Sequence, residues 1–400
     1  MNEWNTISIK EIGKVVTGKT PSKNNPEEWG SAYNFITPSD YGNYHKYADK
    51  SLRQLSELGA DKHKARILPK GSLLVTCIGS DMGKVVQNRL ESFTNQQINA
   101  VIPNHKIASH DFLYYFFKNS EVFLKNLGSD GSAVPILNKS TFENIKIKLP
   151  LLPEQQAIAG VLSALDDKID LLQRQNQTLE QMAATLFRQW FIEEAQEDWE
   201  TFYLEELADI FIGRTPPRKE SHWFSDNVSD IKWVSIKDLG ENGVFTLRTS
   251  EYLPKSTIDH FKIPMIPKDT VILSFKMTVG RVGITYEDMV SNEAIAQFQI
   301  KKWISKELLY CFLKHYNFDI LGTTSSIVTS INTALIKKIE LNLPNIEIIN
   351  KFNQNVESYF NKIKTNQLQI QTLQSLRDTL LPKLIGGEIR LKGFADAPQA

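Results

Sequence analysis

Two short loops carry the residues most suited to holding a phosphate. Gly18-Lys19-Thr20-Pro21 and Gly213-Arg214-Thr215-Pro216 each place a flexible residue, a cation and a hydroxyl in one tight turn. Gly83-Lys84 and Gly280-Arg281 each add a second cation beside a glycine, which permits close approach of the backbone. Phosphates of nucleic acids are contacted by such groups. Recurrence in pairs favours a phosphate-binding role, although a duplication also copies purely structural turns.

To distinguish one DNA base from another, a protein needs polar side chains that contact the edges of the bases in a groove. The sequence does not indicate which side chains make such contacts. The loops Gly128–Ser132 and Gly322–Ser326 differ at their tips beside a well-matched frame, which fits either two readers of different bases or ordinary loop drift. The candidate DNA-binding residues are Gly18, Lys19, Thr20, Ser39, Lys84, Asn95, Ser129, Ser132, Arg214, Thr215, Lys237, Lys276, Arg281, Asn292, Thr323 and Ser326.

Catalytic constellations are not expected. We find no dinucleotide-binding glycine pattern after a strand, no His-x-x-x-His or Cys-x-x-Cys spacing and no Asn/Asp-Pro-Pro-aromatic signature, and we expect no nucleotide phosphate loop. Cys77 and Cys311 match no metal-ligand spacing and are expected to be buried thiols in a reducing cytosol. The seven histidines form no nucleophile–base constellation, and the four in the first copy, His45, His63, His105 and His110, are interpreted as surface residues. We expect a binding component that holds no metal or cofactor and is not itself an enzyme.

Composition and charge indicate a folded protein of two to four domains, with 41% hydrophobic and 23% charged residues among 400. The net charge of zero hides an uneven distribution. Residues 1–150 hold 19 Lys and Arg against 14 Asp and Glu, whereas residues 151–200 hold 3 against 10. An acidic segment is repelled by phosphate and suits contact with protein. No run of eighteen apolar residues and no signal-peptide pattern occurs, so we expect a cytoplasmic protein without a membrane partner.

The chain contains an internal repeat. Residues 127–150 align without a gap on residues 321–344, at an offset of 194, and five further features recur upstream in the same order. Residues 72–78, 145–149, 270–275 and 339–343 are short apolar or β-branched runs and are predicted as strands. Residues 111–124 and 306–318 show helical spacing and are predicted as helices with their aromatic residues in the core. Each copy is therefore predicted to be a mixed α+β domain.

A heptad pattern follows each copy. Polar Asn176 and Asn366 interrupt the two seams, which indicates either residues that fix the register or tolerated positions at the solvent edge. A helix from Glu154 to Phe191 would be roughly 57 Å long. Pro382 is expected to end or kink the second helix, and Gly386-Gly387 to stop it. The seam residues predicted for helix pairing and partner docking are Leu162, Leu165, Ile169, Leu172, Asn176, Leu179, Leu186, Val356, Tyr359, Ile363, Ile370, Leu373 and Leu380.

The expected fold class is α+β: two globular domains in a pseudo-twofold arrangement, separated by an antiparallel two-helix coiled coil. Antiparallel packing follows if the two copies are related by a twofold axis, and it would place one domain at each end. The expected boundaries are a first recognition domain at 1–150, a first spacer helix at 151–194, a second recognition domain at 195–344, a second spacer helix at 345–386 and a tail at 387–400.

This pattern resembles the specificity subunit of type I restriction-modification systems over nearly the whole chain. Its most specific carriers are residues 149–156 (LPLLPEQQ), 162–169 (LSALDDKI), 177–180 (QTLE) and 186–191 (LFRQWF). The ending at 379–390 (TLLPKLIGGEIR) is similar to that of the family. The second helix departs from the pattern where Asn366 and Arg377 interrupt its heptads, which puts the docking surface there in doubt.

The resemblance implies two target-recognition domains, each reading one half of a bipartite double-stranded DNA site, with the coiled coil as a ruler. It also implies docking of two methyltransferase subunits and addition of restriction subunits. S-adenosylmethionine, ATP and Mg²⁺ would then be bound by those partners. Two alternatives stay open: an adaptor that bridges two proteins without DNA, and the specificity component of a related system in which methylation and cleavage share one other polypeptide.

Overall fold

The computed structural model describes residues 4–42, 46–48, 50–128, 135–301, 303–321 and 331–393. The chain forms two compact units, which are described separately below. Unit 1 comprises Met1–Ile169 with Leu373–Ala400, and unit 2 comprises Asp170–Thr372. Each of the two long helices therefore contributes one segment to each unit. Among the described residues, no helix is long and apolar enough to cross a membrane.

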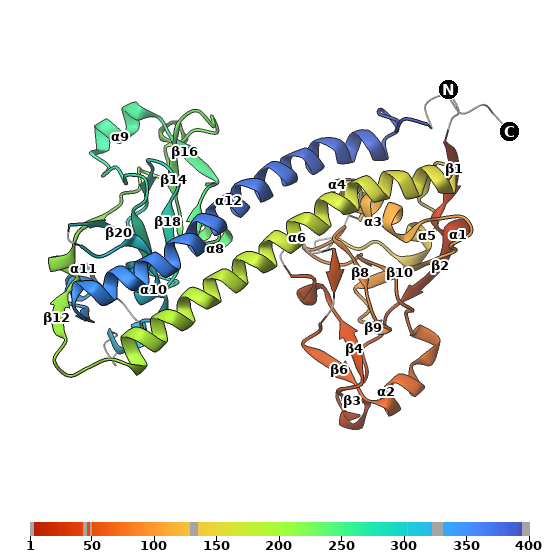
Figure 1. Ribbon diagram of the computed structural model, residues 1–400. Coiled ribbons are helices and arrows are strands. Elements are labelled where there is room, and N and C mark those ends of the chain that lie inside the picture. Colours follow the sequence, from red (N-terminus) through yellow and green to blue (C-terminus); the bar gives the residue numbers. More distant parts are fainter. Residues whose placement is uncertain are drawn as a thin grey trace. The chain divides into compact units, whose positions relative to one another are not determined.

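Unit 1 is built on a five-stranded sheet with the strand order β2-β10-β7-β8-β5 (Figure 1). Its members are β2 (Gly13–Thr17), β10 (Ile98–Pro103), β7 (Leu73–Thr76), β8 (Val85–Asn88) and β5 (Tyr47–Ala48). A two-stranded sheet pairs β1 (Asn5–Ser8) with β11 (Lys146–Leu149), and a four-stranded sheet joins β3 (Trp29–Gly30), β6 (Arg53–Leu55), β4 (Tyr33–Ile36) and β9 (Ser92–Thr94).

Unit 2 repeats this topology strand for strand in its main sheet. The order is β13 (Ala208–Ile212), β20 (Ile295–Ile300), β17 (Val271–Ser274), β18 (Val282–Thr285) and β15 (Phe245–Thr246). A two-stranded sheet pairs β12 (Glu200–Tyr203) with β21 (Glu340–Leu343), and a three-stranded sheet joins β16 (Glu251–Leu253), β14 (Ile231–Val234) and β19 (Val290–Ser291). The four strands predicted from apolar runs are confirmed as β7, β11, β17 and β21.

Short helices flank the sheets. In unit 1 they are α1 (Ile9–Ile12), α2 (Glu57–Lys62), α3 (His110–Asn119), α4 (Glu121–Gly128) and α5 (Lys139–Glu143). In unit 2 they are α7 (Leu204–Leu207), α8 (Ile236–Glu241), α9 (Lys255–Phe261), α10 (Lys306–His315) and α11 (Thr333–Lys337). The single helix expected over 111–124 is wrong: Ser120 ends α3, and its hydroxyl bonds the carbonyl of Phe116.

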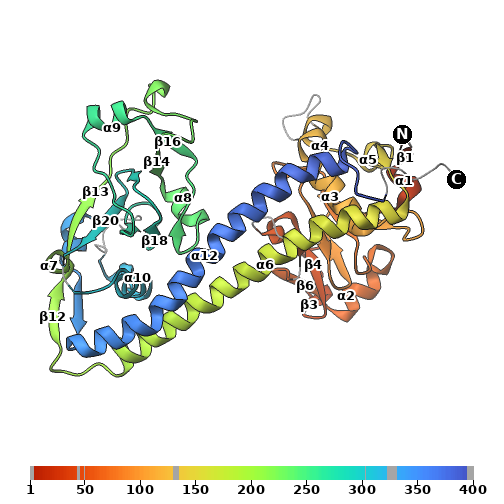
Figure 2. The ribbon, with the colours of Figure 1, turned by 45° about the horizontal axis from the view of Figure 1, so that its top comes forward.

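The core of each unit lies between its sheet and the long helices α6 (Leu152–Arg188) and α12 (Ile346–Ile385). In unit 2, α10 lies between the sheet and these helices, with six consecutive residues from Leu308 to Leu313 buried (Figure 2). The aromatic residues predicted as core are confirmed at Phe112 and Tyr115, which are fully buried. In each unit, one apolar core thus contains residues of the main sheet and of both long helices.

The two long helices run antiparallel within each unit. In unit 2, Phe191 near the end of α6 contacts Phe352 near the start of α12, with ring centroids 5.0 Å apart. In unit 1, Leu162 near the start of α6 shares a core with Leu381 near the end of α12. Every predicted seam residue is buried or half-buried. The heptad prediction and the antiparallel direction are therefore confirmed.

The end of α12 corrects one prediction. Pro382 lies inside the helix, which continues to Ile385, so the expectation that Pro382 ends the helix is wrong, while the expected kink stays a prediction. Proline removes only one backbone donor, and this close to the end the remaining turn still forms. The stop predicted at Gly386-Gly387 is confirmed: the Gly386 N–H donates to the carbonyl of Pro382 (2.8 Å), and Gly387 has φ +73°. A left-handed glycine is a common helix terminator.

Candidate nucleic-acid interface and helix-pair contacts

The loop after β2 in unit 1 fixes a cation on a rigid backbone. A Cβ atom on Gly18 would lie 2.3 Å from the carbonyl oxygen of Thr94, so only glycine fits. The Lys19 N–H donates to that same carbonyl (2.9 Å), and the Thr20 hydroxyl donates to Gln96 Oε1 (2.8 Å). The Lys19 side chain is exposed. The loop therefore presents its ammonium group to solvent from a backbone held on both sides.

The corresponding loop after β13 in unit 2 has the same construction. A Cβ atom on Gly213 would lie 2.1 Å from the carbonyl oxygen of Ser291. The Arg214 N–H donates to that carbonyl (2.8 Å), and the Thr215 hydroxyl donates to the Glu293 carboxylate. Arg214 is exposed. The two loops make equivalent backbone contacts, whereas the acceptor of the threonine hydroxyl differs, Gln96 in one and Glu293 in the other.

Residues 13–20 match the letters of the phosphate loop, G-x-x-x-x-G-K-[ST], a match that our motif analysis missed. The structure shows that the match is accidental. A phosphate loop needs free backbone N–H groups that lead into a helix. Here residues 13–17 form β2, paired with β10, and the next helical turn begins only at Pro26. The pattern therefore forms a strand and a turn, without the nucleotide cradle.

The cations after the second pair of glycines are engaged within the fold. Both glycines adopt a left-handed backbone, with φ of +88° and +87°, in the hairpin loops between β7 and β8 and between β17 and β18. Lys84 Nζ lies 2.6 Å from Asp81 Oδ1. Arg281 Nη1 donates to the carbonyl of Ile236 (2.7 Å). Both stay candidate phosphate contacts, but each has a structural partner that the sequence did not indicate.

Ser39 and Lys237 occupy equivalent places on a shared frame. Asp40 accepts a hydrogen bond from the backbone N–H three residues before it (2.8 Å), and Asp238 does the same (2.9 Å). Each aspartate also accepts from a backbone N–H twelve residues later, at 2.8 Å in both. The residue before each aspartate differs in charge. Ser39 and Lys237 therefore fit the pattern of a matched scaffold with divergent exposed side chains.

The remaining candidates are placed as follows. Asn95 and Asn292 each accept the N–H two residues later through Oδ1, at 3.1 Å in both, so their side chains stabilise turns. Lys276 is exposed, with its ammonium 5.3 Å from the ring centroid of Phe275. Four candidates lie outside the described residues: Ser129, Ser132, Thr323 and Ser326.

In unit 2 the helix pair contains a buried amide contact. Asn366 is fully buried, and its Nδ2 donates to Asn176 Oδ1 (2.8 Å) and to Gln175 Oε1 (2.9 Å). Asn366 Oδ1 has no hydrogen-bond partner among the described residues. The solvent-edge interpretation is therefore wrong for Asn366. The two residues that interrupt the seams contact one another.

In unit 1 the helix pair contains a buried ion pair. Arg377 Nη1 lies 2.7 Å from Asp166 Oδ1, and these side chains are 15% and 11% exposed. The Tyr115 hydroxyl of α3 donates to Asp166 Oδ2 (2.7 Å). Burial raises the pKa of Tyr115 and lowers the pKa of the nearby Lys118. Asp166 of α6 thus contacts both α12, through Arg377, and the globular domain, through Tyr115.

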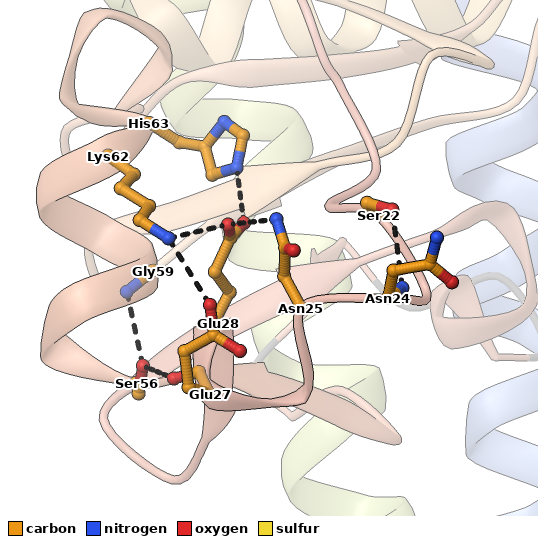
Figure 3. A network of polar contacts seen from close by, with 9 residues as sticks. All are labelled: Ser22, Asn24, Asn25, Glu27, Glu28, Ser56, Gly59, Lys62 and His63. Carbon is orange, nitrogen blue, oxygen red and sulfur yellow. Dashed lines mark hydrogen bonds and ion pairs between the residues drawn. The ribbon is translucent and has the colours of Figure 1, made fainter.

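A second polar network stabilises the outer part of unit 1, between residues 22 and 63 (Figure 3). Glu28 is 3% exposed and bonds His63 Nε2 (2.9 Å), Lys62 Nζ (3.1 Å) and Asn25 Nδ2 (2.8 Å). The hydrogen bonds from His63 and Lys62 lower the pKa of Glu28 to about 2. The surface interpretation of His63 is wrong, because its side chain is 13% exposed and paired.

Unit 2 replaces this network by an aromatic cluster. Trp223 lies in the helical turn that follows the Gly213–Pro216 loop. Its ring stacks on the ring of His260 in α9, with centroids 5.1 Å apart, and meets the ring of Phe261 edge-on, with centroids 5.0 Å apart. The same junction between a helical turn and a short helix is therefore ionic in one unit and aromatic in the other. No group of three or more His, Cys, Asp or Glu residues in the described ranges could hold a metal ion.

Sequence reasoning missed Asp166, Tyr115 as its partner, and the pair of Glu28 and His63. Asp166 stands among other acidic residues in a segment that we interpreted only by its total charge. Its position four residues after Leu162, next to seam residue Leu165, is the signal that could have marked it as half-buried. Nothing in the sequence relates Glu28 to His63.

Comparison with known proteins agrees with this architecture. The family model for the type I restriction modification DNA specificity domain matches residues 1–181 and again residues 196–375. The two matched segments correspond to the two copies of the repeat. The chain therefore belongs to the specificity (S) subunit family of type I restriction-modification systems and carries the family's domain twice.

Curated relatives match along almost their whole length. The specificity subunit of type I restriction enzyme MjaIX from Methanocaldococcus jannaschii is 29% identical over 98% of this chain and 94% of the relative. The corresponding subunit of the HindI enzyme from Haemophilus influenzae is 24% identical over 97% of this chain and all of the relative. A crystal structure of an S subunit from M. genitalium covers 96% of both chains at 17% identity, with a TM-score of 0.60, and shares the fold.

Proposed function

We propose that each unit reads one half of a split, asymmetric DNA site. The observation that carries this proposal is the pair of matched loops, each holding an exposed cation on the same backbone frame. Lys19 and Arg214 suit phosphate contacts, which position a protein on DNA without specifying sequence. Arg214 Nη1 also donates to the carbonyl of Phe261 (2.9 Å), and this hydrogen bond restricts the orientation of the guanidinium group. Divergent neighbours such as Gln96 and Glu293 fit domains that read different bases.

The helix pair would set the gap between the half-sites. Two readers on one face of the duplex sit about one helical turn apart, roughly 34 to 36 Å, and leave unread base pairs between them. Rigid helices with buried seams suit this role because they resist bending. The gap would then depend on the register of α6 against α12.

We further propose that the outer faces of the helices dock two methyltransferase subunits, with restriction subunits added in the full complex. Leu171 and Met182 of α6 are large apolar residues that are 51% and 43% exposed, and a docked partner would remove this apolar surface from water. The acidic composition of this segment favours a protein partner. The chain itself would be noncatalytic, and the partners would bind S-adenosylmethionine, ATP and Mg²⁺.

Salt-dependent binding of the assembled complex to duplex DNA tests the proposal. Each phosphate contact steepens the dependence of affinity on salt. Lys19→Ala should weaken binding to all sequences and reduce the salt slope by about 1 without changing the motif. Lys139→Ala on α5, a side chain 48% exposed, is the matched control and should leave the slope unchanged. A salt-independent complex would instead favour an adaptor that bridges two proteins.

A further inference from the structure

Two polar contacts interrupt an otherwise apolar helix pair, and each lies inside one unit. In unit 2, the buried Asn366 amide donates to Asn176. In unit 1, Arg377 forms an ion pair with Asp166. The other predicted seam residues are apolar and buried or half-buried. Polar groups at such positions cost stability, so their presence needs another explanation.

Neither contact is copied in the repeat. At the offset of 194, Asn176 corresponds to Ile370 and Asn366 to Leu172, and these two side chains are 9% and 2% exposed. By the same offset, Asp166 corresponds to Phe360 and Arg377 to Ala183, each 1% exposed. The equivalent positions are therefore apolar and buried. Along the seam, α6 and α12 differ in where their polar residues lie.

We propose that these two contacts determine which helices pair: they select the unlike pair, α6 with α12, and reject the pairing of α6 or α12 with the same helix of a second chain. The duplication makes this choice necessary. Because both helices carry apolar residues at most of the equivalent seam positions, α6 could in principle pair antiparallel with α6 of another copy, and α12 with α12. Apolar packing alone does not discriminate among these pairs.

In each wrong pair the polar groups lose their partners on the facing helix, and Arg377 and Asp166 keep only Asp378 and Tyr115. If α6 took the place of α12, Asn176 would face Leu172 and Asp166 would face Ala183. If α12 took the place of α6, Asn366 would face Ile370 and Arg377 would face Phe360. Because such a pair consists of two identical antiparallel helices, each mismatch would occur twice. A buried unpaired amide is costly, and so is a half-buried charge that loses its partner on the facing helix. The pair of α6 with α12 gives each of the four side chains a polar partner on the facing helix.

The same contacts reject a shifted register. Sliding α12 by one heptad would bring Asn366 opposite Ile169 or Ala183, both at most 5% exposed in the native pair. A single buried asparagine is known to fix register in coiled coils in this way. Partner choice and register are therefore set by the same few residues.

The test refolds the full chain from urea over a range of concentrations and measures chain stoichiometry by native mass spectrometry. Asn176→Ile with Asn366→Leu copies the apolar residues of the equivalent positions. This variant should raise the two-chain fraction at least about tenfold over wild type, increasing with concentration, because one of the two discriminating contacts is lost. An unchanged distribution overturns the proposal.

Two control variants distinguish a change in helix-pairing specificity from non-specific association through added apolar residues. Thr178→Ile with Thr372→Leu adds the same apolar residues at exposed positions of the same helices, and should refold like wild type. Leu172→Asn with Ile370→Asn makes the seam more polar, yet it provides an asparagine partner in every wrong pair, so its two-chain fraction should also rise. Two outcomes would contradict the proposal. In the first, the Thr178→Ile/Thr372→Leu variant forms two-chain species as readily as the Asn176→Ile/Asn366→Leu variant. In the second, the Leu172→Asn/Ile370→Asn variant folds but forms no more two-chain species than wild type, whereas the Asn176→Ile/Asn366→Leu variant does.

Discussion

Asn366 and Asn176 lie 190 residues apart and meet across the two long helices, Nδ2 to Oδ1, at 2.8 Å. Asn366 is fully buried, and its Oδ1 has no hydrogen-bond partner among the described residues. A buried amide that satisfies only part of its hydrogen-bonding capacity contributes little net stability. The contact is therefore better explained by specificity than by stability, and this distinction can be measured.

Replacing one asparagine should cost more than replacing both. Asn366→Leu leaves the Asn176 amide facing a hydrocarbon, which should lower the free energy of unfolding by about 1–3 kcal/mol. Asn176→Ile with Asn366→Leu removes both polar groups and should restore or exceed wild-type stability. Urea unfolding of the three chains checks this. Equal losses in the single and double variants would mean that the two amides do not depend on one another.

The ion pair in unit 1 should behave differently. Asp166→Ala removes the less exposed of the two carboxylates that pair with Arg377, leaving only Asp378, which is 61% exposed, and it also removes the acceptor of the Tyr115 hydroxyl. We expect a loss of about 1–3 kcal/mol in the unfolding of unit 1, because the Tyr115 hydroxyl and the Arg377 guanidinium each lose a charged hydrogen-bond partner. Asp170→Ala is the control, because its pair with Arg174 is 40% and 68% exposed and should be worth about 0–1 kcal/mol. Similar urea midpoints for the two variants would show that the Asp166 pair is not effectively buried.

Neighbouring leucines on α6 separate folding from docking. Leu172 is 2% exposed, so Leu172→Glu should destabilise the helix pair by several kcal/mol, on the order of 3–5. Leu171 is 51% exposed, so Leu171→Glu should leave the unfolding free energy within about 0.5 kcal/mol of wild type. If the outer face docks the methyltransferase, Leu171→Glu should nevertheless reduce copurification of that subunit. Full copurification would place the docking surface elsewhere.

The Glu28 network predicts a pH dependence confined to unit 1. Hydrogen bonds from His63 and Lys62 hold the pKa of Glu28 at about 2, below the ordinary value of 4.5. A lowered pKa in the folded state stabilises the fold above the ordinary pKa and is lost as pH falls through the folded value. Hydrogen exchange of peptides covering 24–63 should therefore rise between about pH 5 and about pH 3.

Glu28→Gln should remove most of this rise. Glu27→Gln should not, because the Glu27 side chain is 50% exposed and its contact with Lys62 is longer, at 3.3 Å. Intrinsic exchange rates are corrected for pH in all three proteins. A wild-type rise that persists in Glu28→Gln would assign the acid sensitivity to other carboxylates.

Periodic features could be predicted from the sequence, because they arise from local repetition of apolar residues. The heptads placed Leu162, Ile169 and Leu172 in a buried seam, and all three are at most 5% exposed. The repeat predicted two similar domains, and the two five-stranded sheets share one strand order. Alternation also marks β11, in which Ile147 and Leu149 are buried between exposed lysines.

Contacts between distant polar residues could not be predicted in this way. Asp166 meets Arg377 only because the chain returns antiparallel, 211 residues later. The partner of Arg281 is a backbone carbonyl, which leaves no mark in the sequence. The end of α3 is equally hidden: helical spacing continues through Ser120, but the backbone of Ser120, with φ −98° and ψ 6°, leaves the helical conformation. The same limit applies to the phosphate-loop letters at 13–20, which pair as a strand.

Methylome sequencing of a host that expresses this chain with its methyltransferase tests the central claim most directly. The methylated motif should consist of two unrelated half-sites with a fixed gap. Exchanging residues 5–149 for the first domain of another family member should change one half-site and leave the other half and the gap unchanged. A contiguous palindrome, or a motif that changes in both halves after this exchange, would contradict the account.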